Sequence, residues 1–239
     1  MHRRRFLVTS TAASAGLILG LDRPAQAAKT LRLLTPEADP GQIKAWNAVF
    51  EDFGAKQKDV TVKGEFAKWD DIHPACMPIL YDQPSDVGAD RIVNGVAAYE
   101  RFGRGANRPV VVVDFGTATT FDAISARGEY LGGAICPGVQ ISADALFRRA
   151  ARLPRIDVRK PPGVIGRTTI GAMQSGLFWG YVGMVEGLVR RMDAELGGGS
   201  ISVATGGLAE TIAPETTLIH HVDPDLTLQG LRIVWERNQ

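Results

Sequence analysis

The sequence has few cysteines, no excess of one sign of charge and no long apolar segment. Its two cysteines, Cys76 and Cys136, form no Cys-x-x-Cys pair, which excludes a zinc ribbon or a disulfide framework, although one disulfide between them stays open. Lys and Arg number 27 against 26 Asp and Glu, for a net charge of +1. This balance argues against nucleic acid as the main partner. The apolar run at residues 6–21 contains several hydroxyl residues and is too short and too polar for a stable membrane span.

The composition is that of an ordinary globular protein. The chain has 239 residues, of which 45% are hydrophobic and 22% charged. A chain of this length can form one large domain or two small ones, each with a core of its own.

Residues 1–27 have the pattern of an export signal. Three arginines, residues 3–5, precede Phe6 and the apolar run, and Ala25-Gln26-Ala27 supplies a small-x-small cleavage pattern. Paired arginines in this place are typical of the twin-arginine signal, which predicts export to the periplasm. A basic disordered N-terminus or a misassigned start is the alternative interpretation.

Residues 28–72 predict a β-α-β unit. Apolar residues at 31–34 indicate a strand, Asp39-Pro40 opens a helix with apolar residues at helical spacing, and residues 60–66 alternate as a second strand. The segment resembles the opening of extracellular solute-binding proteins of sugar-type transporters. Any β-α-β unit gives a similar pattern, so no binding residue is predicted here.

The rest of the chain predicts a ribonuclease-H-like α/β fold. The predicted strands are 110–113, 119–125, 129–135 and 201–204, and the predicted helices are 92–99, 139–151, 169–195 and 226–237. The first three strands form an antiparallel meander with turns at Gly116 and Gly128. This order of elements is that of the building block of the actin-like ATPases and sugar kinases.

Asp114-Phe115-Gly116-Thr117-Ala118-Thr119-Thr120 is the segment most indicative of chemistry. An aspartate at the end of a buried strand meets a turn where Gly116 lets backbone N–H groups approach a ligand. A carboxylate, bare backbone and hydroxyl groups together suit a phosphate and its cation. A hairpin with a threonine-rich strand is the structural alternative.

Three further segments each allow a structural and a functional interpretation. Asp90 and Arg91 at a helix start are either a cap and a surface charge, or a general base and an anchor for an anionic substrate. The threonine at the start of the helix at 169 either caps it or binds substrate. The paired glycines at 206–207, between a strand and a helix, resemble a nucleotide-binding turn.

Seven segments resemble, in the same order, the motifs of type III pantothenate kinases. The family motifs are YDNP-like, GADR, DFGTATTFD, GGAIxPG, GxNT, TGGLA and LTLxGL segments. They match the ranges 81–84, 88–91, 114–122, 132–138, 166–169, 205–209 and 226–231. The resemblance implies transfer of the γ-phosphate of ATP to the 4′-hydroxyl of pantothenate, the first step of coenzyme A synthesis.

The resemblance also implies a role for each matched position. Asp90 corresponds to the catalytic proton acceptor, Asp114 to the ligand of a monovalent cation (K⁺ or NH₄⁺), and Thr117 with Gly116 to contacts of ATP, which carries Mg²⁺. The substrate-binding positions are Tyr81, Gly88, Ala89, Arg91 and Thr169. Family members are homodimers. Glycines at 176, 180, 183 and 187 suit either close packing of two copies or ordinary core packing.

The sequence departs from the family pattern at two places. Thr168 stands where the GxNT motif has Asn, and no D-x-G-N-T phosphate loop occurs in the sequence. We therefore expect residues 73–108 to be a remnant of a truncated first kinase domain, residues 109–239 to be the second domain, and kinase activity to be very weak.

The location and the activity both have alternatives. The kinase resemblance implies the cytoplasm, where ATP is, whereas the signal implies export. The functional alternatives to a kinase are an exported, non-enzymatic solute-binding module led by residues 28–72 and a catalytically inactive regulatory relative.

Overall fold

The computed structural model describes residues 17–19, 29–35, 47–48, 51, 60–66, 77–150 and 153–237. The chain divides into two compact units, Met1–Ile72 and His73–Gln239. Within the described residues, no helix is both long and apolar enough to cross a membrane.

The first unit contains a three-stranded sheet in the order β1-β2-β3. Strand β1 (Leu17–Leu19) pairs antiparallel with β2 (Lys29–Thr35), and β2 pairs parallel with β3 (Val60–Phe66). The two predicted strands are confirmed. Residues 47, 48 and 51 are helical, while most of the predicted helix and of the predicted signal lies outside the described residues.

The second unit contains a five-stranded mixed sheet in the order β6-β5-β4-β7-β8. The strands are β4 (Val110–Phe115), β5 (Ala118–Ile124), β6 (Tyr130–Pro137), β7 (Ile201–Gly206) and β8 (His221–Val222). Strands β4, β5 and β6 form the predicted antiparallel meander, while β7 runs parallel to β4 and β8 parallel to β7. This arrangement is the mixed sheet of a ribonuclease-H-like domain.

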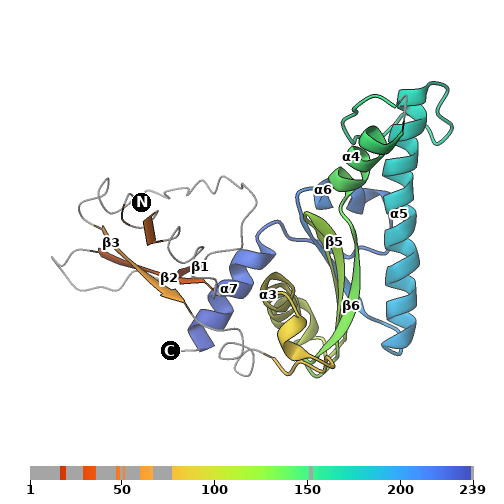
Figure 1. Ribbon diagram of the computed structural model, residues 1–239. Coiled ribbons are helices and arrows are strands. Elements are labelled where there is room, and N and C mark those ends of the chain that lie inside the picture. The colour runs from red at the N-terminus through yellow and green to blue at the C-terminus, as the bar shows by residue number, and fades with distance from the viewer. Residues whose placement is uncertain are drawn as a thin grey trace, which may run out of the picture. The chain divides into compact units, whose positions relative to one another are not determined.

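Helices cover both faces of this sheet (Figure 1). One side carries α5 (Thr169–Glu195) with α4 (Val139–Arg149) and the short α6 (Ala209–Ile212). The other side carries α3 (Ala89–Ala98), which continues into a π-helical turn, Tyr99–Gly103, and packs against α7 (Leu226–Arg237). Short 3₁₀ turns lie at Pro84–Asp86 and Ala213–Glu215.

The four valines at 110–113 show why β4 is the central strand. All four have no exposed surface, as expected for a strand that is covered on both faces. Alternation along the strand then separates the faces: Val111, Val113 and Phe115 join the core under α5, so Asp114 points to the face that α3 covers.

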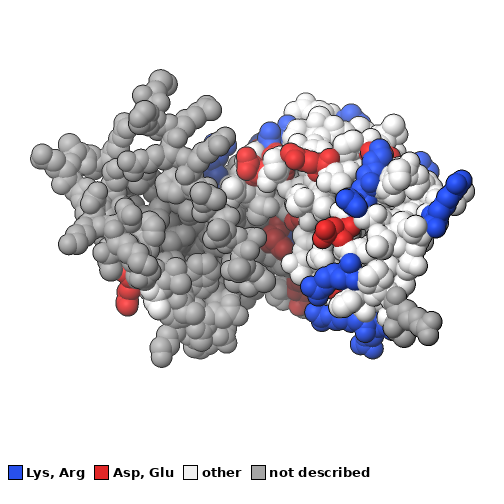
Figure 2. Space-filling model, turned by 90° about the horizontal axis from the view of Figure 1, so that it is seen from above, with Lys and Arg blue, Asp and Glu red and all other residues white. Residues whose placement is uncertain are grey.

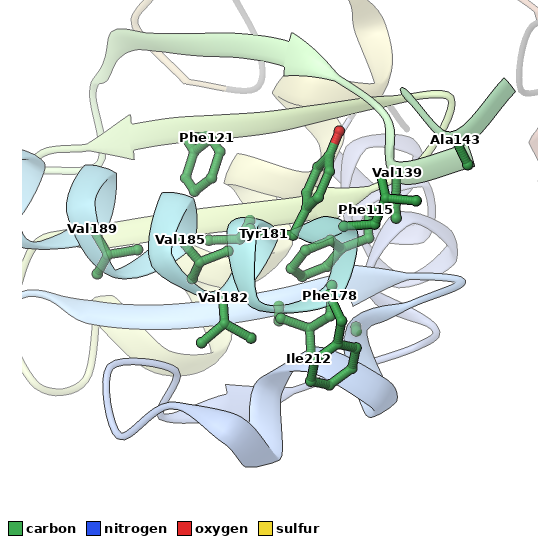
Figure 3. Packing of buried hydrophobic residues seen from close by; sticks show 14 of the residues in the cluster. Phe115, Phe121, Val139, Ala143, Phe178, Tyr181, Val182, Val185, Val189 and Ile212 are labelled. Carbon is green, nitrogen blue, oxygen red and sulfur yellow. The ribbon is translucent and has the colours of Figure 1, made fainter. Parts of the chain in front are cut away.

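The core between the sheet and α5 is a continuous apolar layer (Figure 3). Helix α5 contributes residues at helical spacing, including Phe178, Val182, Val185 and Val189, and these pack against Phe115 and other strand residues. The helix begins where Thr168 caps it, its side-chain oxygen accepting the N–H of Gly171 over 3.0 Å. The cap is therefore Thr168, and Thr169, for which capping was the structural alternative, is the first residue of the helix.

The structure differs from the sequence prediction in a few element bounds. Strand β7 runs on through Gly206, which had been placed in a turn. Strand β8 and helix α6 were not predicted, because both are too short for a periodic pattern to show.

On the face of the second unit shown in Figure 2, basic and acidic side chains are interspersed.

Candidate functional site at the C-terminal ends of β4 and β7

Two of the glycine-containing motifs meet at one edge of the sheet. Strands β4 and β7 are parallel, with Asp114 opposite Thr205 and Phe115 opposite Gly206. The turn after β4, at Gly116 and Thr117, therefore lies beside the turn after β7, and the N–H of Gly207 donates to the carbonyl oxygen of Phe115 over 3.2 Å. Exposed backbone at the carboxyl ends of adjacent parallel strands is a common place for phosphate binding.

The backbone conformation and the nearby Asp114 require a glycine at position 206. The φ of Gly206 is +89°, and a Cβ there would lie 2.6 Å from Oδ1 of Asp114. A side chain at 206 would therefore be strained by the backbone and would also displace the carboxylate. The turn thus leaves a bare surface directly against Asp114.

Asp114 and Asp90 lie close enough to affect each other. The pKa of Asp114 is raised from 3.8 to about 6, first by burial and then by the negative charge of Asp90, while a hydrogen bond from Asn94 opposes the rise. Asn94 donates to Oδ2 over 3.0 Å. The structure therefore brings together the two carboxylates that the sequence had singled out, one from α3 and one from β4.

Asp90 is available to a substrate. It is exposed in the first turn of α3, and among the described residues its Oδ1 accepts only the N–H of the next residue, Arg91, over 2.9 Å. The N-cap of the helix is Gly88, without a side-chain cap. Asp90 is therefore not the N-cap, which was the structural alternative for this position.

Arg91 is buried, contrary to the surface-charge interpretation. Only 6% of the residue is exposed. Its Nε donates to Oδ1 of Asp122 over 2.7 Å, and the hydroxyl of Tyr130 donates to the same oxygen over 2.7 Å. Burial raises the pKa of Asp122, although Arg91, Tyr130 and Thr120 oppose the rise. The guanidinium group is thus held on the α3 side of the sheet, against Asp122 and Tyr130.

Tyr81 lies next to this group of buried residues. Its ring centroid is 6.4 Å from that of Tyr130, and the guanidinium carbon of Arg91 is 5.8 Å from the Tyr130 centroid. Tyr81 is 37% exposed. The predicted substrate residues Tyr81, Gly88, Ala89 and Arg91 therefore surround the start of α3 together with Asp90.

Thr169 is not brought to this group. It is the first residue of α5, on the other side of the sheet, and is exposed. Among the described residues it makes no hydrogen bond to Asp90, Arg91 or Tyr81.

Asp114 offers an oxygen atom to which a cation could bind. No group of three or more His, Cys, Asp or Glu side chains that could hold a metal occurs within the described part of the chain. Oδ1 of Asp114 accepts no hydrogen bond from a described residue and faces the bare turn at Gly206. Oxygen atoms of this kind are the ligands that hard cations prefer.

Comparison with known proteins decides the family. A family model described as type III pantothenate kinase matches residues 51–191. The chain belongs to the type III pantothenate kinase family. It is 61% identical over 162 residues to the type III pantothenate kinase of Moorella thermoacetica, and 62% identical over 162 residues to that of Myxococcus xanthus. Each match covers 68% of this chain and 62% of the relative, so the chain spans less than two thirds of their length.

Among solved structures, a conserved putative Baf family transcriptional activator from Campylobacter jejuni is similar over 80% of both chains. It is 20% identical with a TM-score of 0.43. A score this low adds nothing to the fold seen here.

Four residues around the site were not predicted from the sequence. Asn94, Asp122, Tyr130 and Thr227 all take part in buried or partly buried hydrogen bonds there. Asn94 stands in an otherwise apolar stretch of α3, and Asp122 lies inside a motif that had been quoted. A polar residue in a predicted buried element was the signal available for both.

Proposed function

We propose that this chain binds pantothenate beside ATP and transfers the γ-phosphate of ATP to the 4′-hydroxyl of pantothenate. The proposal rests on the approach of Asp90 to Asp114: Asp90 lies one turn before Asn94 on the same face of α3, and Asn94 donates to Asp114 beside the turns at 116–117 and 206–207. Family membership supports it, and the chain's partial coverage of its relatives keeps the activity a proposal.

Each residue has one task in this mechanism. The exposed carboxylate of Asp90 accepts the proton of the 4′-hydroxyl as its oxygen attacks the γ-phosphorus, and the bond to the β–γ bridging oxygen breaks to release ADP. Arg91 binds the carboxylate of pantothenate, and Tyr81, whose ring lies near that of Tyr130, binds the substrate beside it. Gly116 and Thr117 contact ATP through backbone N–H and hydroxyl groups.

Cations supply positive charge to this reaction. Asp114 would hold the monovalent cation, K⁺ or NH₄⁺, through its free Oδ1, and Mg²⁺ arrives with ATP. Positive charge near the phosphates favours the transition state of phosphoryl transfer, whose charge is spread over the equatorial oxygens.

We expect weak turnover from this chain. A D-x-G-N-T loop, which the family uses as a phosphate cradle, is absent from the sequence. Losing contacts of this kind costs about 3 kcal/mol or more of transition-state stabilisation. Phosphorylation of pantothenate at a rate typical of kinases, and abolished by Asp90→Asn, would contradict this expectation.

Ligand-induced thermal stabilisation tests the substrate. We expect millimolar pantothenate to raise the melting temperature of the full chain, because a ligand that binds only the folded state stabilises it. The Asp90→Asn variant should keep this shift, since Asp90 acts on the proton, whereas Arg91→Met should lose it. A shift with sugars and none with pantothenate would instead favour the solute-binding alternative, for which the parallel pair β2–β3 is the supporting observation.

We also propose that two copies associate through α5. Gly176, Gly180 and Gly183 are exposed on this helix, and a Cβ at any of them would meet no atom within 4 Å. Ordinary core packing within one copy therefore does not explain them. Close packing of α5 against a second copy would explain these glycines. It would also bring a surface of the second copy near the exposed Thr169.

The cellular compartment of the chain can be tested directly. A kinase reaction requires ATP and so favours the cytoplasm, whereas residues 1–27 predict export. Cell fractionation of the full chain, beside a variant with Arg4→Lys and Arg5→Lys, separates the two. Periplasmic, shortened protein that the double variant abolishes would establish the signal.

A further inference from the structure

The carboxylate of Asp122 is the centre of a buried polar cluster. The residue has no exposed surface. Its Oδ1 accepts from Nε of Arg91 and from the Tyr130 hydroxyl, each over 2.7 Å, and its Oδ2 accepts from the Thr120 hydroxyl over 3.2 Å. A buried charge with this many donors is fixed in position, because any movement breaks several hydrogen bonds at once.

The strand register explains why these groups meet under α3. Thr120 pairs with Asp114 across β4 and β5, and Asp122 pairs with Gly133 across β5 and β6. Residues two apart in a strand share a face. Asp114, Thr120 and Asp122 therefore all point toward α3, from which Arg91 approaches.

Among the described residues, Nη2 of Arg91 has no hydrogen-bond partner. This nitrogen is buried, while Nε of the same guanidinium is fully engaged. The nitrogen lies against β6 at Gly133, where a Cβ would stand 2.9 Å from it and would also overlap the carbonyl oxygen of Phe121. A buried cationic donor without an acceptor is costly in an isolated protein.

We propose that Asp122 and Tyr130 are positioning residues, which hold the guanidinium of Arg91 in the orientation in which it binds the carboxylate of pantothenate. This inference rests on the proposed function and adds two residues that no motif assignment gave a role. Asp122 fixes Nε and thereby the plane of the guanidinium. Tyr130 fixes Asp122, and its ring lies beside the guanidinium carbon.

Tyr130 is suited to this task because it remains a neutral donor. Burial raises the pKa of its phenol, and the charge of Asp122 raises it further. The hydroxyl therefore keeps its proton at any physiological pH and continues to donate to Asp122.

The test compares pantothenate with pantothenol, in which a hydroxyl replaces the carboxylate. Binding of both compounds to the full chain is measured by calorimetry, and their affinity ratio is the readout. For the unmodified chain we expect pantothenate to bind about tenfold or more tightly, because a charge-assisted hydrogen bond is lost with pantothenol. A general loss of stability weakens both compounds alike and leaves the ratio unchanged.

The informative variants are Tyr130→Phe and Asp122→Asn. We expect both to reduce the ratio toward one, with the affinity for pantothenol little changed. Tyr181→Phe is the matched control, because its hydroxyl donates to the carbonyl oxygen of Pro137 over 2.7 Å, away from Arg91. Circular dichroism confirms folding, and Tyr130→Phe, which leaves the buried ion pair intact, serves if Asp122→Asn does not fold.

The outcomes separate the inference from the proposed function. A reduced ratio in Tyr130→Phe with an unchanged ratio in Tyr181→Phe supports the positioning role. An unchanged ratio in both Tyr130→Phe and Asp122→Asn overturns it while leaving pantothenate as the ligand. If the unmodified chain binds neither compound, the proposed function fails and the inference fails with it.

Discussion

The side-chain amide of Asn94 donates to Oδ2 of Asp114 over 3.0 Å, and its carbonyl oxygen accepts from the hydroxyl of Thr227 over 2.7 Å. These two hydrogen bonds connect α7 to α3 and α3 to β4. Asn94 is almost fully buried, so no water replaces a partner that is removed. The C-terminal helix is thereby connected to the carboxylate proposed to hold a cation.

Replacing Asn94 should destabilise the protein more than its size suggests. Asn94→Leu keeps the branched shape and the number of side-chain heavy atoms but removes the hydrogen bonds to Asp114 and Thr227, and the free energy of unfolding should fall by about 1–3 kcal/mol. Urea denaturation at neutral pH measures this. Thr227→Val, which leaves the bond to Asp114 intact, should cost less. Equal losses in the two variants would contradict the importance of the Asp114 bond.

The raised pKa of Asp114 predicts a pH dependence of stability. Its pKa is about 6 in the folded chain against 3.8 ordinarily, so folding favours the protonated form. The stabilisation is complete below pH 3.8 and is lost as the pH rises through about 6. Relative to the unmodified chain, Asp114→Asn should therefore gain up to about 3 kcal/mol between these limits. Denaturation midpoints of both chains across this pH range test it.

Potassium should reduce that difference. A bound cation favours the charged carboxylate, so KCl should stabilise the unmodified chain at pH 7.5 more than Asp114→Asn. Tetramethylammonium chloride at equal ionic strength is the control for screening. An equal response of both chains to the two salts would argue against a potassium site at Asp114.

The sequence predicted the elements well because their patterns are long or strongly apolar. The four valines of β4 and the 27 residues of α5 leave little choice of structure. Asp90 and Asp114 were singled out for the same reason, since each stands at the boundary of a clear element. Asp122 and Tyr130, which hold Arg91, were not singled out, because their meeting depends on strand register.

Register cannot be obtained from the alternating pattern alone. The pairing of Asp114 with Thr120 depends on how many residues the turn at Gly116 contains. A shift of one residue in β5 would turn Asp122 to the face covered by α5. The structure settles this, and with it which carboxylate holds Arg91.

Gly133 should tolerate no side chain. A Cβ there would overlap the carbonyl oxygen of Phe121 and crowd Nη2 of Arg91, so Gly133→Ala should lower the free energy of unfolding by about 1–3 kcal/mol or more. Gly105→Ala is the matched control, because it adds the same methyl group in open space at a backbone φ that is not positive and should stabilise the chain by about 0.4–1 kcal/mol. Thermal denaturation of both variants should therefore show shifts of opposite sign.

Gly180→Leu should separate two copies without harming either one. Within one copy, a side chain at 180 points into open space, and a leucine in mid-helix gains about 0.8 kcal/mol in helix propensity over glycine. Between two copies, the same leucine would hold the helices apart, because helix axes approach closely only over small residues. Sedimentation velocity of the unmodified chain should show a dimer that Gly180→Leu converts to a monomer of unchanged or higher melting temperature. Gly105→Leu, which adds the same side chain in open space away from α5, should remain dimeric. An unmodified chain that is monomeric at high concentration, or a Gly180→Leu variant that stays dimeric, would show that the exposed glycines of α5 serve something other than association of two copies.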